Sequence, residues 1–88
     1  MFRIEKVSDG RSITLRMSGR IDSELVPEIQ EQIDRCPEPP KLDLQEVLLA
    51  DRAAVRFLLL CQGRGIEILH CPLYIEEWML REKLHDST

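Results

Sequence analysis

The fold of this chain is decided by residues 41–60, which read KLDLQEVLLADRAAVRFLLL. Leu42 and Leu44 alternate with polar neighbours, as one face of a strand requires, and residues 45–50 then predict a tight loop. From Val55 onward the apolar residues run almost without a break, which predicts a helix wrapped by the rest of the domain. We therefore expect a short strand, a loop and a buried helix.

Asp51 stands where that loop meets that helix. Its carboxylate can accept a hydrogen bond from a free backbone N–H of the first turn, so Asp51 is the expected N-cap. Arg52 follows where the partial positive charge of the helix end disfavours a cation, and Arg56 lies one turn further on the same side. One interpretation is that both arginines are solvated, with Arg52 compensated by Asp51 or Asp22. The other is that an acidic surface on a partner meets Arg52.

Composition limits the function classes. With 88 residues the chain is one domain, 1–88, whose tail 84–88 we expect to fray. The net charge of −4 leaves no basic footprint for nucleic acid. No apolar run approaches the roughly 20 residues of a membrane span, and the charges within residues 1–6 do not fit a signal peptide. We expect a cytoplasmic protein that binds neither nucleic acid nor membrane.

The residues before the deciding stretch predict an antiparallel hairpin. Apolar and polar residues alternate over 2–7 and over 13–18, as they do in half-buried strands. Asp9-Gly10 lies between the two runs and is a signal for a tight hairpin turn.

A helix is expected next, capped by Asp22 or Ser23 and running to about Cys36. Apolar residues recur at every fourth position over 25–33, which places one apolar stripe against the core. The proline-rich segment 37–40 ends this helix, because proline lacks the N–H and disfavours a helical conformation before it.

After the buried helix, residues 63–65 make a turn, and residues 66–69 predict a strand parallel to residues 41–44 through a right-handed crossover. A last helix is expected over 73–83. Together these elements predict an α/β fold, with an antiparallel N-terminal hairpin plus a parallel βαβ unit in one mixed sheet flanked by about three helices.

The last helix carries an aromatic and apolar stripe that includes Tyr74 and Trp78. We expect this stripe to belong to the core, and an exposed edge on it would offer a homodimer contact.

Few residues suggest chemistry. Cys36, Cys61 and Cys71 are an odd count, so reduced thiols are expected. His70 and Cys71 are adjacent and would point to opposite faces of a strand, so they do not form a nucleophile pair. The cysteines and histidine lack the spacing of a zinc site. We expect no catalysis, no metal and no cofactor.

Two segments resemble the STAS domains of the anti-sigma factor antagonist family. Residues 15–22, LRMSGRID, resemble the first third of such domains, and the run from Leu42 through Val47 to Asp51 resembles their central strand and loop. The resemblance covers roughly residues 2–79. It implies a STAS-like mixed sheet flanked by helices, without cofactor or catalysis. It also implies that the loop before the second helix docks on an anti-sigma factor kinase, which phosphorylates a serine there.

The chain departs from this family at that loop. Where the family has Asp-Ser-Ser-Gly, this chain has Asp51-Arg52-Ala53-Ala54, so Ala53 occupies the phosphoacceptor position and cannot be phosphorylated. A phosphate there would add close to two negative charges at a helix N-terminus, so its absence leaves a binding surface without that switch. The residues expected to bind a partner are Asp22, Ser23, Asp51, Arg52, Ala53 and Arg56.

Two function classes follow. The first is a non-catalytic protein-interaction module of the anti-sigma factor antagonist type, with an anti-sigma factor kinase or another signalling protein as its partner. The second is a small-molecule site for a nucleotide or anion, or a thiol-based redox sensor, on the same loop and using Cys61 or Cys71.

Overall fold

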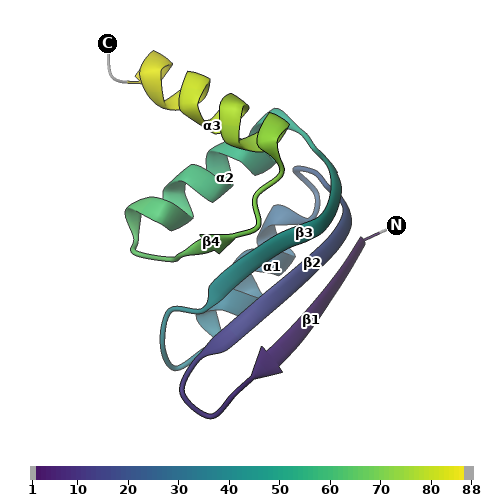
Figure 1. The fold of residues 1–88 in the computed structure, drawn as a ribbon, viewed down its shortest axis with the longest axis vertical. Coiled ribbons are helices and arrows are strands. Elements are labelled where there is room, and N and C mark those ends of the chain that lie inside the picture. Colours follow the sequence, from purple (N-terminus) through teal and green to yellow (C-terminus); the bar gives the residue numbers. More distant parts are fainter. Residues whose placement is uncertain (1, 87–88) are drawn as a thin grey trace.

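The computed structural model describes residues 2–86, with side chains described as far as residue 84. Its four strands form one sheet in the order β1-β2-β3-β4 (Figure 1). β1 and β2 pair antiparallel, whereas β2–β3 and β3–β4 are parallel, which confirms the predicted mixed sheet. The elements are, in chain order, β1 (Phe2–Ser8), β2 (Ile13–Ile21), α1 (Val26–Asp34), β3 (Lys41–Ala50), α2 (Arg52–Gly63), β4 (Ile68–Leu69) and α3 (Leu73–Asp86).

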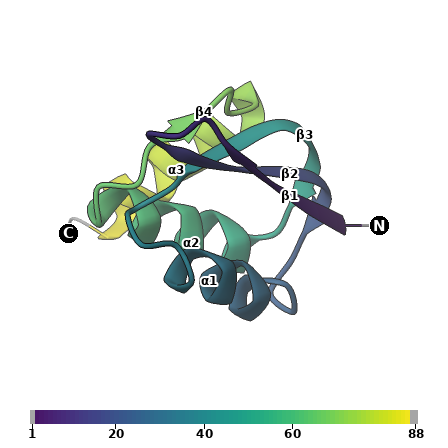
Figure 2. The same ribbon diagram turned by 90° about the horizontal axis from the view of Figure 1, so that it is seen from below.

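α1 and α2 lie on the same side of the sheet (Figure 2), and α3 packs against α2. The core forms between these helices and the sheet face that they cover, where β2 contributes Leu15 and Met17 and β3 contributes Leu42 and Leu44. Burial of this apolar surface is the main favourable contribution to folding. In the part of the chain that the structure describes, no helix has the length and apolar character needed to cross a membrane.

β3 is much longer than the sequence pattern indicated. The expected loop over 45–50 is strand, and the expectation of a short strand followed by a loop was wrong. Pairing with β2 continues to the end, where Val47 faces Gly19 and Ala50 faces Ile21. Two register shifts in this pairing disturb the alternation of burial, so the apolar pattern over 45–50 does not look like a strand.

α1 is shorter than predicted at both ends. It begins at Val26 and ends at Asp34, so it neither starts after a cap at Asp22 or Ser23 nor reaches Cys36. A turn made by residues 22–25 comes first, in which the Asp22 carboxylate accepts the backbone N–H groups of Glu24 and Leu25.

α2 begins with Asp51 as its N-cap, as predicted, but it is not wrapped on all sides. Leu58 is 1% exposed, whereas Leu59 is only partly buried and Leu60 is 65% exposed. Arg52, Ala53 and Arg56 are also exposed, so one side of α2 faces solvent along its whole length.

The C-terminal elements follow the predicted order with shifted ends. β4 contains only Ile68–Leu69 and pairs with β3 at Leu42 and Asp43, so the expected strand over 66–69 is halved. α3 continues to Asp86, three residues past the predicted end. The last two residues of the tail that we expected to fray lie outside the described residues.

Candidate functional site

The carboxylate of Asp51 joins two segments that are distant in sequence. Its Oδ1 accepts the backbone N–H of Ala54 at 2.9 Å and caps α2, while its Oδ2 accepts the backbone N–H of Ser23 at 3.0 Å. The backbone N–H of Asp51 also donates to the carbonyl of Ile21 at 3.1 Å. The end of β3, the start of α2 and the turn after β2 are therefore held in one arrangement.

Asp22 organises the turn that leads into α1. Its Oδ1 accepts the backbone N–H groups of Glu24 at 3.0 Å and of Leu25 at 3.2 Å. Together with Asp51, this carboxylate satisfies backbone donors that would otherwise lack partners near the helix starts. The structure thus brings Asp22, Ser23 and Asp51 together, although none of them caps α1.

Arg52 and Arg56 both donate to Glu82 of α3. Their Nε atoms lie 3.1 and 3.0 Å from the same oxygen, Oε1 of Glu82, whose side chain is 11% exposed. These two hydrogen bonds hold the pKa of Glu82 below its usual value and keep the carboxylate ionised. The compensation of Arg52 comes from Glu82, so the expectation that Asp51 or Asp22 would supply it was wrong. Both arginines instead tie α2 to α3.

Glu82 was not identified from the sequence, although a signal for it exists. Ile75, Met79 and Glu82 follow one another at intervals of four and three residues, which places them on one face of α3. The first two are buried core residues. A carboxylate that continues a buried stripe needs a cationic partner, because burial of an unpaired charge is costly. Arginines on another helix are suitable partners.

The start of α3 and the end of β3 form an apolar and aromatic edge on the surface. The phenol of Tyr74 donates a hydrogen bond of 2.6 Å to the backbone carbonyl of Leu48. Leu48 and Leu49, near the end of β3, are 73% and 50% exposed. Tyr74 is itself 41% exposed, so the aromatic stripe expected to lie in the core is partly on the surface. Partial burial raises the pKa of the Tyr74 phenol.

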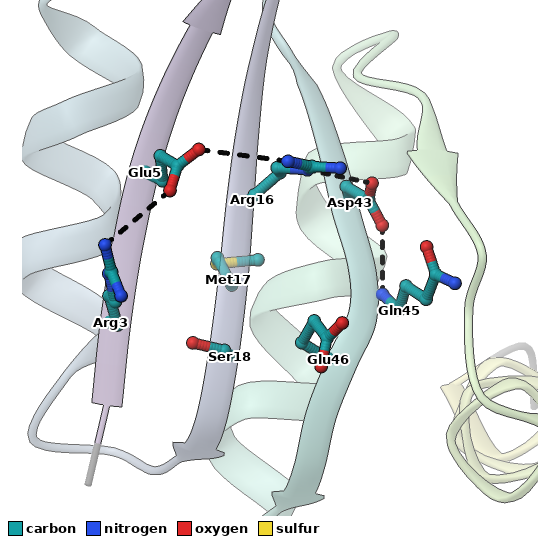
Figure 3. Close-up of a pocket in the computed structure, with 8 residues that line it drawn as sticks. All are labelled: Arg3, Glu5, Arg16, Met17, Ser18, Asp43, Gln45 and Glu46. Atoms are coloured by element: carbon teal, nitrogen blue, oxygen red, sulfur yellow. Dashed lines mark hydrogen bonds and ion pairs between the residues drawn. The ribbon is translucent and has the colours of Figure 1, made fainter.

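The sheet face away from the helices carries a second candidate, a polar trough of about 300 Å³ (Figure 3). Arg16 lies between Glu5, at 3.8 Å, and Asp43, at 3.9 Å. Asp43 also accepts the backbone N–H of Gln45 and lies 3.3 Å from Nδ1 of His70. The charges in this trough pair with one another across the strands, as on a solvated sheet face.

Cys61 and Cys71 lack the low pKa of a reactive thiol. Burial raises the pKa of Cys61 to about 11, and it also raises the pKa of Cys71. A thiol with a raised pKa carries little of the reactive thiolate at neutral pH. Among residues 2–86 no group of three or more histidine, cysteine, aspartate or glutamate side chains is arranged to hold a metal ion.

No family model and no curated protein matches this chain. Solved structures do resemble it. A crystal structure of Mglu is 16% identical with a TM-score of 0.63, and the match covers 77% of this chain and 19% of Mglu. The STAS domain of an antisigma-factor antagonist from Rhodobacter sphaeroides is 18% identical with a TM-score of 0.58, and the match covers 78% of this chain and 86% of that domain.

The chain has a STAS-like fold. The resemblance found in residues 15–22 and 42–51 is therefore confirmed at the level of the fold. In this STAS-like fold Ala53 is exposed in the first turn of α2.

Proposed function

We propose that this STAS-like domain is a non-catalytic protein-interaction module of the anti-sigma factor antagonist type. It binds an anti-sigma factor kinase or another signalling protein through the junction surface, defined here as Asp22, Ser23, Asp51, Arg52, Ala53 and Arg56. The single observation that carries this proposal is the double role of Asp51, which fixes the turn after β2 to the start of α2. A surface that is already ordered loses little conformational entropy on binding.

The module is competent to bind without a phosphorylation switch. Ala53 is exposed in the first turn of α2, where a phosphate would otherwise change the local charge by nearly two units. Alanine offers no acceptor atom for a phosphoryl group. Binding through the junction surface therefore depends on the partner's concentration and not on phosphorylation at the start of α2.

The small-molecule alternative has less support. An anion bound at the start of α2 would need free backbone N–H groups there, and the Asp51 carboxylate already accepts that of Ala54. The raised thiol pKa values also disfavour redox sensing through Cys61 or Cys71.

To test the proposal, the tagged full chain is used to capture its partner from the native cell. The affinity for the captured partner is then measured by titration calorimetry. Ala53→Glu places a bulky acid on the exposed first turn, where the helix end tolerates it, and should weaken binding at least about tenfold. Gln62→Glu adds the same charge at an exposed position in the last turn of the same helix and is the charge control.

Equal affinities for wild type and Ala53→Glu would show that the junction surface is not part of the interface. A nucleotide or acidic metabolite that raises the melting temperature, with no protein captured, would favour the small-molecule class instead.

A further inference from the structure

Arg52 and Arg56 are held side by side. Both Nε atoms donate to a single oxygen of Glu82, so the two Nε atoms cannot be farther apart than the sum of two hydrogen-bond lengths. Glu82 is almost buried and stays ionised between them. Two long side chains that would otherwise sample many rotamers are thereby fixed as a pair.

Most donors of this pair remain available. A guanidinium carries five N–H donors, and each arginine uses only its Nε–H toward the described part of the chain. The side chains of Arg52 and Arg56 are 58% and 53% exposed, so their terminal nitrogens can be reached from solvent. Planar guanidinium groups bind carboxylates through two parallel hydrogen bonds.

Taken together with Glu82, the two arginines carry a net charge of +1, although the whole chain is negative. Two guanidinium groups share one carboxylate, and the start of α2 adds a partial positive charge to them. The nearby Asp51 directs both oxygens to backbone N–H groups and not to the arginines. In a chain of net charge −4, this pair offers an acidic group a favourable site on the junction surface.

We propose that Arg52 and Arg56 form a paired-arginine site, positioned by Glu82, that binds an aspartate or glutamate side chain of a protein partner. The inference rests on the proposed function, because it names the chemistry of the partner at the same surface. In this site Glu82 is a positioning residue: it orients the two arginines and does not touch the ligand itself.

The test follows the arginine Nε–Hε signals of the labelled full chain by NMR at low salt. A synthetic peptide with a Glu-Asp-Glu centre should move the signals of Arg52 and Arg56, and the matched Gln-Asn-Gln peptide should move neither. The double variant R52Q/R56Q should bind the acidic peptide about tenfold more weakly. The double variant R3Q/R16Q removes the same charge from the uncovered sheet face and should bind like wild type.

Equal weakening in both double variants would overturn the proposal, because the binding would then follow net charge alone. Inorganic phosphate that competes fully with the peptide would make this a small-anion site and would also overturn it. A captured partner that is lost by Ala53→Glu but kept by R52Q/R56Q would refute the arginine pair and leave the proposed function standing. Failure to capture any partner would refute the proposed function itself.

Discussion

The phenol of Tyr74 and the backbone carbonyl of Leu48 are joined by a hydrogen bond of 2.6 Å, which ties the first turn of α3 to the end of β3. The opposite part of α3 is tied to α2 through Glu82. The helix is thus attached at two polar points, with the buried side chains of Ile75 and Met79 between them. Its orientation therefore depends on polar contacts as well as on apolar packing.

Tyr74→Phe should reduce the free energy of unfolding by about 0.5–1.5 kcal/mol, because it removes the hydrogen bond to Leu48 and keeps the ring. Urea unfolding of both proteins measures the difference. Leu73→Ala, at a neighbouring and 70% exposed position, serves as the control and should change stability by less than about 0.5 kcal/mol. Equal effects of the two substitutions would show that the hydrogen bond contributes nothing.

Asp51→Ala should lower the free energy of unfolding by about 0.5–2 kcal/mol or more. It removes the N-cap of α2, and the hydrogen bond to the Ser23 N–H is lost as well. Asp51→Asn keeps one acceptor oxygen and should fall between alanine and wild type. Asp9→Ala gives, for comparison, the cost of losing an exposed aspartate that accepts the backbone N–H groups of Arg11 and Ser12 in the hairpin turn. If Asp51→Asn has the same melting temperature as wild type, only one of the two hydrogen bonds of the Asp51 carboxylate contributes to stability.

Leu58→Ala should cost about 2–5 kcal/mol, since Leu58 is 1% exposed and its truncation leaves a cavity. Leu59→Ala should cost less, because Leu59 is only partly buried and is not wrapped by the rest of the domain as the sequence pattern predicted. Urea unfolding of the two variants compares neighbouring positions of one helix. A larger loss for Leu59→Ala would place the buried face of α2 one residue away from where the structure has it.

The stability difference between wild type and Glu82→Gln should depend on pH. Hydrogen bonds from Arg52 and Arg56 lower the pKa of Glu82 below its ordinary value of 4.5. The ionised carboxylate therefore stabilises the fold above pH 4.5, and this contribution is lost as the pH falls through the lowered pKa. Chemical unfolding across that range should show the two proteins converging in acid. A difference in unfolding free energy that does not change with pH would refute the ion-pair role. Glu77→Gln, at an exposed position of α3, is the control.

A related anti-sigma factor kinase with ATP should leave residues 48–57 unmodified, because this segment contains no serine, threonine or tyrosine. Mass spectrometry of the incubated protein checks this, and Ala53→Ser restores an acceptor at the same place as a positive control. Phosphate on Ser23, Ser18 or Thr14 would show that a switch exists elsewhere and would contradict constitutive binding. Ser23 is exposed beside the start of α2, and of these three residues it is the one that belongs to the junction surface.

The elements that depend on local signals could be predicted from the sequence. Asp9-Gly10 marked the hairpin turn, and the Asp9 side chain accepts the backbone N–H of Ser12 there at 2.8 Å. Asp51 was recognised as a cap because a short acidic side chain before a helix has one dominant use. These signals lie within a few residues of the structure that they specify.

The features that depend on distant contacts could not be predicted in this way. The second half of β3 is held by pairing with β2, and register shifts there removed the alternation that a reader of the sequence would look for. The link from Arg52 to Glu82 spans 30 residues and two helices. The positions of Arg52 and Arg56 on the helix predicted that they belong to the candidate site. Their contact with Glu82 depends on how α3 packs against α2, which the sequence does not show.

The strands lie in the sheet in the same order as in the chain, β1-β2-β3-β4. Each strand therefore emerges from the ribosome when its neighbour has already been synthesised, and no strand must wait for a later one or insert between two others. The sheet can be extended at one edge during translation, with the parallel additions coming after the local hairpin. The final strand, Ile68–Leu69, is also the shortest, and it pairs with β3 only at Leu42 and Asp43, so β4 itself shields little of the β3 edge from pairing with a second nascent chain.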